Sequence, residues 1–295
     1  MIYVVGQVVF DSISELKQFP KPNSTSYIKR YGKFFGGAAG NVAAACSKMG
    51  QKASLVSFVG EDFKGSAYEK YLKSNRIDMT HLKIVKGEKT PHAFMFNDSA
   101  GRQMSFFYWG SAEMFHTAPI PKLRFGRNDV VHLANGSPNF NMRFARKYPG
   151  VSFDPGYDIV AYKKEDIEGV LKNTRILSCN EFEMSRILKL LRLKRREELF
   201  AFPVECIVVT KGKRGSSVAT RDESFEVPAI KAKLVDPTGA GDSFRAAFLS
   251  AFLRRESIET CAKIASSVAS FVVEKYGAQT NIPTWKEAAE RLRES

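Results

Sequence analysis

The residues with the clearest chemical potential lie in DPTGAGDSFRAAF, residues 236–248, where glycines and an acidic residue precede an apolar helical pattern. The first turn of a helix carries unpaired N–H groups and the positive end of the helix dipole, so it binds anions. Glycines there let a phosphate group approach the backbone closely. The segment therefore predicts an anion site at the start of a helix.

Asp242 follows the second glycine of this segment. An aspartate near a helix start can cap it by accepting a hydrogen bond from an N–H group two or three residues on. A cap does not require Gly-Ala-Gly before it, whereas a general base beside a bound phosphoryl group gives every residue a role. We therefore predict that Asp242 accepts a proton from a hydroxyl group while residues 239–241 hold the phosphoryl group.

Other phosphate-binding motifs are absent from the sequence. It contains no G-x-x-x-x-G-K-[ST], and no G-x-G-x-x-G follows the first predicted strand, which excludes a Walker loop and a dinucleotide fingerprint. The four histidines have neither H-E-x-x-H nor close ligand spacing, so we do not predict a zinc enzyme.

The composition favours a soluble protein with anionic ligands. Lys and Arg number 45 against 31 Asp and Glu, a net charge of +14 that is spread along the chain. GKRG (212–215) matches the G-x-x-G loop of RNA-binding KH modules, but it follows a predicted strand instead of joining two helices. No signal peptide or long apolar run is present, and the four cysteines lie far apart. We expect a cytoplasmic protein that binds neither nucleic acid nor membranes.

The elements that must position the anion site form an α/β pattern. Short β-branched runs alternate with helical patterns, which is typical of a mostly parallel sheet covered by helices. Two segments, 12–35 and 90–109, instead resemble β-ribbons and predict a small sheet outside the main one. No repeat or linker interrupts the chain, so we expect one domain over 1–295. The predicted main strands are 2–6, 53–60, 129–135, 151–154, 175–180 and 206–212.

Several motifs, in order, resemble those of the ribokinase (PfkB) family of sugar and nucleoside kinases. FFGGAAGNVAAACSKMG (34–50) resembles its first signature and DPTGAGD (236–242) its second. Between them, NEFE (180–183) matches N-x-x-E and TKGKRG (210–215) matches T-K-G-x-x-G. The resemblance covers about residues 2–285. It implies a three-layer α/β/α sandwich with a lid formed by segments 12–35 and 90–109.

The resemblance also implies roles for individual residues and the cofactors ATP and Mg²⁺. The catalytic group is Asp242 with the backbone of Gly239, Ala240 and Gly241. The acceptor's sugar hydroxyls would contact Asp11, Gly37 and Asn41, with Gln7 reaching a base or ring oxygen. The nucleotide would be lined by Thr210, Gly212, Gly215 and a segment that ends at Asn281, with Asn180 and Glu183 organising magnesium and the phosphates through water. Pro237 departs from the family pattern and puts a monovalent-cation site in doubt.

The acceptor is less constrained by the sequence. The second ribbon is rich in aromatic residues, and we predict that Phe106 stacks on a nucleobase while Gln103 bonds its edge. The alternative is that these rings pack the lid onto the main domain or a second subunit. Asp154 follows a strand where open sheets bind ligands, so it contacts the acceptor or starts the turn before Pro155.

The chain is also similar to archaeal nucleoside kinases of the family, for example at FYWG and SFVVEKYGAQTNIPTW. We therefore predict an ATP-dependent nucleoside kinase that phosphorylates the 5′-hydroxyl group and forms a homodimer. A sugar or phosphosugar kinase is the alternative, because basic residues of the lid could bind a second phosphate. These residues are Lys29, Arg30, Lys33 and Arg102.

Overall fold

The computed structural model describes residues 1–100, 102–126 and 128–295. Within these ranges the large sheet has nine strands in the order β13-β12-β11-β10-β9-β8-β1-β4-β5. Pairing is parallel from β11 to β5 and antiparallel at β12 and β13. The strands are β1 (Ile2–Val5), β4 (Ala53–Gly60), β5 (Asp78–Val85), β8 (Val130–Leu133), β9 (Val151–Phe153), β10 (Thr174–Asn180), β11 (Cys206–Thr210), β12 (Ser216–Ala219) and β13 (Ser224–Val227). The predicted mostly parallel sheet is confirmed.

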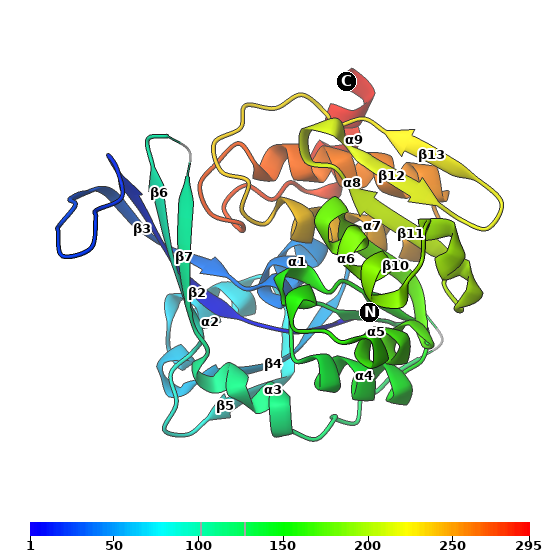
Figure 1. Ribbon diagram of the computed structural model, residues 1–295, viewed down its shortest axis with the longest axis horizontal. Helices are drawn as coiled ribbons and strands as arrows, with labels where there is room; N and C mark the ends of the chain where they lie inside the picture. Colours follow the sequence, from blue (N-terminus) through cyan, green and yellow to red (C-terminus); the bar gives the residue numbers. More distant parts are fainter. Residues whose placement is uncertain (101, 127) are drawn as a thin grey trace.

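Helices cover both faces of this sheet and complete the three layers (Figure 1). Alternate residues of β1 point to opposite sides: Ile2 packs with the first set of helices and Tyr3 with the second. The first set is α1 (Ala38–Lys48), α2 (Ala67–Ser74), α7 (Ala240–Leu253), α8 (Ile258–Val272) and α9 (Trp285–Glu294). The second set is α3 (Met114–Thr117), α4 (Pro138–Lys147), α5 (Lys164–Leu171) and α6 (Glu181–Leu191).

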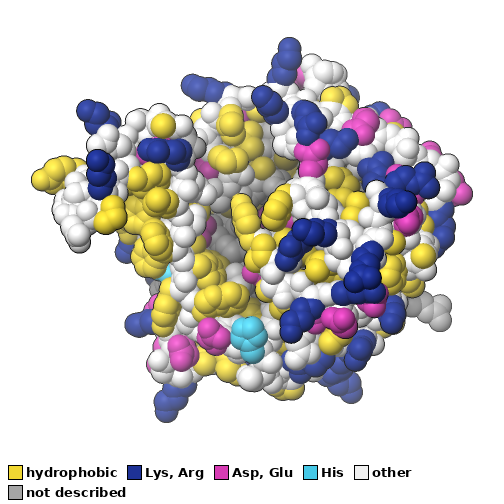
Figure 2. Space-filling model, viewed as in Figure 1, with side chains coloured by type: hydrophobic (Ala, Val, Ile, Leu, Met, Phe, Trp, Pro, Cys, Tyr) yellow, Lys and Arg dark blue, Asp and Glu magenta, His cyan; other side chains and the backbone are white. Residues whose placement is uncertain are grey.

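A separate sheet of four strands, ordered β3-β2-β6-β7, stands beside the large domain on the left of Figure 1. Its strands are β2 (Val9–Leu16), β3 (Ile28–Gly36), β6 (His92–Asp98) and β7 (Gln103–Tyr108). The predicted small sheet is therefore present, although residue 101 of the turn in the second ribbon lies outside the described residues. Figure 2 shows that the surface is hollowed between this small sheet and the large domain.

The two faces of the small sheet differ. Asp11 pairs with Ala93, and Ala93 pairs with Phe107, so these side chains share one face, which we call the cleft face. Phe34 pairs with Asp11 and lies against Gly277, which donates a hydrogen bond to Asp236 just before α7, so this face lies towards the start of α7. Phe94 and Phe106 pair with each other on the opposite face, which we call the outer face.

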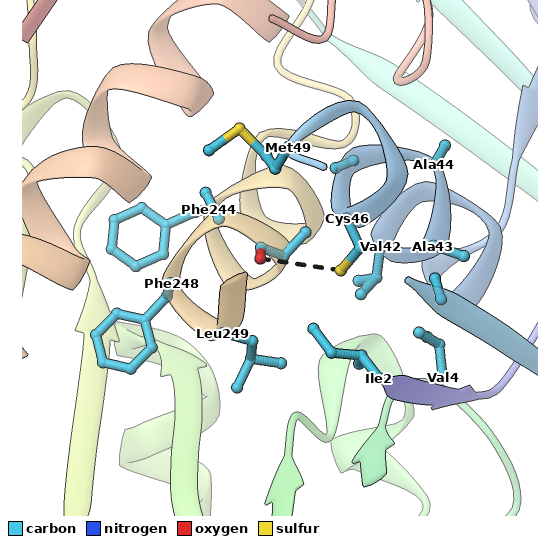
Figure 3. Close-up of a cluster of buried hydrophobic side chains, with 14 of the residues drawn as sticks. Ile2, Val4, Val42, Ala43, Ala44, Cys46, Met49, Phe244, Phe248 and Leu249 are labelled. Atoms are coloured by element: carbon cyan, nitrogen blue, oxygen red, sulfur yellow. Dashed lines mark hydrogen bonds between the residues drawn. The ribbon is translucent and has the colours of Figure 1, made fainter. Parts of the chain in front are cut away.

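The contact between α1 and α7 brings two predicted site segments together. Cys46 of α1 and Ala246 of α7 are fully buried at this interface, and the Cys46 thiol lies 3.9 Å from the Ala246 carbonyl oxygen (Figure 3). Small side chains let the helix backbones approach closely. As a result, Asn41 in the first turn of α1 lies against the start of α7.

All four cysteines are free and buried. Burial raises the pKa of the thiols of Cys46, Cys206 and Cys261 to about 12 and raises that of Cys179 further above its usual value. In the described part of the chain, no helix is long and apolar enough to span a membrane.

Candidate functional site

The start of α7 has the geometry of an anion site. Gly239 is the N-cap residue with φ of 77°, and no side chain caps the helix. A Cβ at this position would lie 2.3 Å from the Cβ of Ala278, so the turn requires glycine. Within the described residues, the N–H groups of Gly239 and Gly241 donate to no backbone carbonyl, whereas Ala240 N–H donates to Pro237 O at 3.2 Å. Two of the three predicted amides are thus free to bind an anion.

Asp236 fixes the loop that carries these amides. Its Oδ1 accepts hydrogen bonds from the N–H and hydroxyl groups of Thr238, at 2.9 and 2.6 Å. Its Oδ2 accepts a bond from the Gly277 N–H group at 2.8 Å. One buried carboxylate therefore ties the glycine loop to the C-terminal segment that the sequence placed near the nucleotide.

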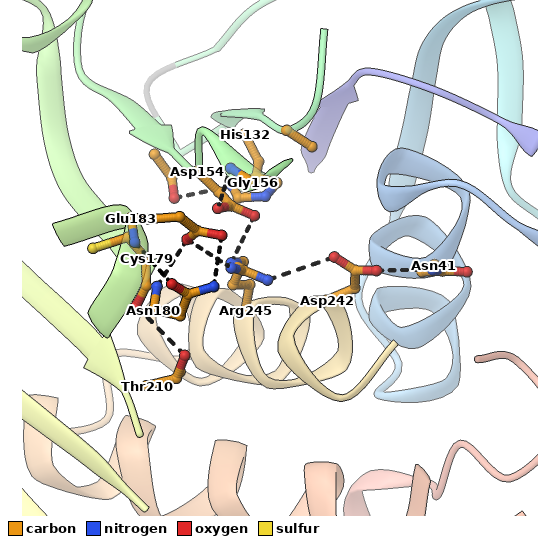
Figure 4. A network of polar contacts seen from close by, with 12 residues as sticks. Asn41, His132, Asp154, Gly156, Cys179, Asn180, Glu183, Thr210, Asp242 and Arg245 are labelled. Atoms are coloured by element: carbon orange, nitrogen blue, oxygen red, sulfur yellow. Dashed lines mark hydrogen bonds and ion pairs between the residues drawn. The ribbon is translucent and has the colours of Figure 1, made fainter. Parts of the chain in front are cut away.

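Asp242 lies in the first turn of α7 but is not its cap. Its Oδ2 accepts a hydrogen bond from Asn41 Nδ2 at 2.8 Å, and its Oδ1 lies 3.5 Å from Arg245 Nη1 (Figure 4). The side chain is 17% exposed, so it is not sealed in the interior. Burial raises the pKa of Asp242, while Arg245 and the Asn41 bond oppose that rise. A carboxylate that is partly open beside free amides has the arrangement of a general base.

Arg245, which was not predicted from the sequence, lies between Asp242 on one side and Asp154 and Glu183 on the other. Its Nε lies 2.7 Å from Asp154 Oδ2, and its Nη2 lies 3.9 Å from Glu183 Oε2. A cationic residue inside the otherwise apolar pattern SFRAAF is the signal that could have revealed it. Asp154 is buried, and its Oδ1 also accepts a hydrogen bond from the Gly156 N–H group at 3.0 Å. This bond spans Pro155, where a turn that starts at Asp154 was predicted. The contact of Asp154 with an acceptor stays a prediction.

Asn180 and Glu183 form a capping box at the start of α6. Asn180 donates to both oxygens of Glu183, from its side chain at 2.7 Å and from its backbone at 2.8 Å. Glu183 N–H donates back to Asn180 Oδ1 at 2.9 Å. Burial raises the pKa of Glu183, and the charge of Arg245 opposes it. The described residues contain no group of three or more His, Cys, Asp or Glu side chains that could hold a metal ion.

Among the predicted acceptor residues, Asn41 contacts Asp242 directly. Asn41 links it to a chain of polar groups, because its Oδ1 accepts a bond from Gln279 Nε2 at 2.8 Å, and Gln279 also bonds the Tyr68 hydroxyl at 2.7 Å. Gly37 has φ of 82°, and a Cβ there would lie 2.4 Å from the carbonyl oxygen of Gln7. The buried side chain of Gln7 makes no hydrogen bond within the described residues.

Asp11 resembles Gln7 in being a buried polar side chain. It is 5% exposed, and within the described residues its carboxylate accepts no hydrogen bond. Burial raises its pKa to about 8, and the charges of Asp242 and Asp236 add to the effect. Gly36 leaves room for this carboxylate, since a Cβ there would lie 2.0 Å from Asp11 Oδ2. A buried acceptor without a donor is the kind of group that a ligand hydroxyl can complete.

The two predicted residues of the second ribbon lie on different faces of the small sheet. Phe106 lies on the outer face and is 60% exposed, whereas Phe107 lies on the cleft face. Gln103, also on the cleft face, donates to Asn97 at 2.9 Å. The register of the strands decides which ring faces the cleft, and the sequence pattern did not supply it.

The predicted nucleotide residues lie at the end of β11, in the turn after it, and in the segment that follows α8. Thr210 ends β11 and contacts the Cys179 carbonyl oxygen at 3.4 Å. Gly212 and Gly215 have positive φ in the turn that follows, while Asn281 bonds the Phe271 carbonyl group. Contact of these residues with ATP stays a prediction.

Comparison with known proteins identifies the family to which the chain belongs. The chain matches the pfkB family of carbohydrate kinases over residues 1–285. It is 42% identical to a nucleoside kinase of Methanocaldococcus jannaschii, over 99% of this chain and 96% of that protein. It is 43% identical to a nucleoside kinase of Methanothermobacter thermautotrophicus, over 99% of this chain and 95% of that protein.

Solved structures agree with these matches. The crystal structure of the M. jannaschii nucleoside kinase, an archaeal member of the ribokinase family, has a TM-score of 0.95 at 41% identity, covering 100% of this chain and 98% of that one. Fold and relatives together define a phosphotransferase with a ribokinase-like fold and an alcohol group as acceptor. The chain belongs to the pfkB family of carbohydrate kinases.

Proposed function

We propose that the protein is an ATP-dependent kinase that transfers the γ-phosphate to the 5′-hydroxyl group of a nucleoside, with Asp242 as the base. The observation that carries this proposal is the partly exposed Asp242 carboxylate beside the uncapped amides of Gly239 and Gly241. The two relatives above, which are named nucleoside kinases, support the choice of acceptor.

In this mechanism the acceptor oxygen forms a bond to the γ-phosphorus in line with the bond that breaks, and ADP leaves. The hydroxyl proton passes to Asp242. The free amides at the start of α7 stabilise the charge on the transferred group. Asp11 accepts hydrogen bonds from the sugar hydroxyls, and Asn41 keeps Asp242 oriented. Closure of the small sheet as a lid over the hollow would exclude water.

A magnesium ion fits this site only through phosphate and water oxygens. Both oxygens of Glu183 already accept bonds from Asn180, and Asp154 is paired with Arg245. These hard oxygen groups suit the second coordination sphere of Mg²⁺, which keeps several waters in most protein sites. Bound with the nucleotide, the ion would neutralise phosphate charge, and Glu183 would orient its water ligands.

The charges of the small sheet favour a nucleoside over a phosphosugar. Arg102 forms hydrogen bonds with Asp98 at 2.6 and 2.8 Å. Arg30 lies over the ring of Tyr276 at 4.2 Å. Two of the four cations that could bind a second phosphate therefore have other partners.

The cleft face offers an aromatic surface for the base. Phe107 is 40% exposed on the same face as Asp11, and we propose it, in place of Phe106, as the ring on which the nucleobase stacks.

The outer face fits a second copy of the chain. Its exposed apolar side chains form a patch that a monomer leaves in water. We propose that two chains form a homodimer through this face. Its members are Tyr31, Phe94, Met104, Phe106 and Tyr108, all at least 40% exposed.

An acceptor screen tests the proposed function. ATP consumption is measured with nucleosides, ribose and fructose phosphates, for the wild type and Asp242→Asn. We expect phosphorylation of nucleosides at the 5′ position and a loss of about a hundred- to ten-thousandfold in kcat for the variant, with ATP binding nearly unchanged. A response to phosphorylated sugars alone would overturn the acceptor, and an unimpaired variant would overturn the role of Asp242.

A further inference from the structure

Arg245 has a position that the proposed mechanism does not explain. It projects from the second turn of α7, and its side chain is only 7% exposed. Its sequence neighbours Phe244 and Ala246 pack in the apolar core. A buried guanidinium is costly unless it is paired, so this position in a core helix calls for a specific role.

The guanidinium is held mainly by one partner. Asp154 lies 2.7 Å from Nε, whereas Asp242 and Glu183 lie 3.5 and 3.9 Å from the terminal nitrogens. Within the described residues, Nε has no hydrogen bond of good geometry. Asp154 therefore anchors the side chain by charge and leaves its outer end directed towards Asp242 (Figure 4).

Gly241 provides the space for this arrangement. A Cβ at position 241 would lie 2.6 Å from Arg245 Nη1. Because Asp154 anchors the guanidinium, Arg245 cannot move aside freely. The second glycine of the anion loop thus lets the cation fold back over the first turn of α7, next to the amide that binds the phosphoryl group.

The carboxylate of Asp242 is contacted from two sides. Asn41 donates from α1 to one oxygen, and Arg245 faces the other from α7. Asn41 gives orientation but no charge, and burial alone favours a protonated, inactive Asp242. The other titratable groups near Asp242 are Asp11 on β2, Tyr68 on α2, Asp154 after β9 and Glu183 on α6, and none of them is a cation.

We propose that Arg245 is a positioning residue for phosphoryl transfer: anchored by Asp154, it keeps the Asp242 carboxylate ionised and fixed opposite Asn41. This inference rests on the proposed role of Asp242 as the base. It assigns a function to Asp154 as well, which acts through Arg245 and not on the acceptor.

Steady-state kinetics give the first test. We expect Arg245→Gln to lower kcat about ten- to a hundredfold while the KM for ATP changes less than about threefold. Arg245→Lys should recover part of the loss, because it restores the charge without the planar geometry. Arg254→Gln is the matched control: Arg254 follows the same helix, bonds the Met49 carbonyl group at 3.0 Å and lies over Trp285. An equal loss of kcat in this control would reduce Arg245 to a packing role.

A double variant tests whether Arg245 acts through Asp242. If it does, Asp242→Asn combined with Arg245→Gln is no slower than Asp242→Asn alone. Multiplied defects would overturn the inference. Arg245→Gln alone leaves the buried Asp154 without its cationic partner, which could destabilise the fold. The double variant Arg245→Gln with Asp154→Asn removes that acid and so serves as a control for misfolding. We expect this double variant to fold and to have the same kcat as Arg245→Gln alone.

Titration of the free protein gives a readout that needs no acceptor. The carboxyl ¹³C resonance of Asp242, assigned with Asp242→Asn, should titrate at higher pH in Arg245→Gln than in the wild type or the Arg254→Gln control. An unchanged titration would overturn the inference even if the kinase is active. Inactivity of the wild type towards every nucleoside would overturn the proposed acceptor alone, since this measurement would still decide the role of Arg245.

Discussion

Asp11 should make the free protein less stable as the pH rises, and Asp11→Asn should remove that loss. The carboxyl group is 5% exposed and receives no hydrogen bond from the described residues. Burial raises its pKa to about 8 from an ordinary value of 3.8, with further increases from Asp242 and Asp236. The folded protein therefore binds a proton that the unfolded chain releases, so stability falls between about pH 4 and pH 8.

The size of the effect follows from this interval. Each pKa unit corresponds to about 1.4 kcal/mol, so the carboxyl group costs on the order of 4 kcal/mol at pH 7 relative to pH 4. An asparagine of the same shape does not titrate and avoids this cost. The gain in stability of Asp11→Asn should be near zero at pH 4 and should grow steadily towards pH 8.

Urea denaturation of the ligand-free wild type and variant, at several pH values from 4 to 8.5, measures this difference. Parallel stability curves would refute the reasoning, because they would mean that Asp11 titrates alike in the folded and unfolded states. Above about pH 8, where Asp11 is mostly ionised, the same variant should raise the acceptor KM at least about tenfold with the KM for ATP unchanged, since an amide accepts fewer bonds from sugar hydroxyls than a carboxylate does. Stability and acceptor binding thus change in opposite directions.

Two further predictions concern the small sheet and the glycine loop. Phe107→Ala should raise the nucleoside KM roughly ten- to a hundredfold, while Phe94→Ala, equally exposed on the outer face, should not; equal effects would contradict the assignment of faces. Asp236→Asn should lower the free energy of unfolding by about 1–3 kcal/mol because its Thr238 and Gly277 bonds cannot all be kept, and a urea midpoint equal to that of the wild type would show that the loop does not depend on it.

The sequence was most informative where local chemistry decides structure. Buried parallel strands such as β4 and β11 are recognisable as short, largely apolar runs, and the glycines before α7 predicted where that helix begins. The β5 strand was not predicted, because it lies at the sheet edge and its side chains are mostly half-buried and mixed in polarity. Edge strands carry a weaker pattern than buried ones.

The features that could not be predicted from the sequence depend on contacts between segments that are far apart in the chain. Which ring of the second ribbon faces the cleft depends on the pairing of β6 with β2, and one residue of register moves every side chain to the other face. Arg245 was missed for a similar reason. Its partners Asp154 and Glu183 come from other elements, so their convergence appears only in the folded chain.

The burial of all four thiols has a practical consequence for experiments on this protein. Thiolates react with maleimides, and the raised pKa values leave almost none in the native state at neutral pH. A single cysteine introduced on the outer edge of β7 would therefore be labelled selectively by a maleimide fluorophore, because the four native thiols would not react. Motion of that strand could then be followed in real time without first removing the natural cysteines.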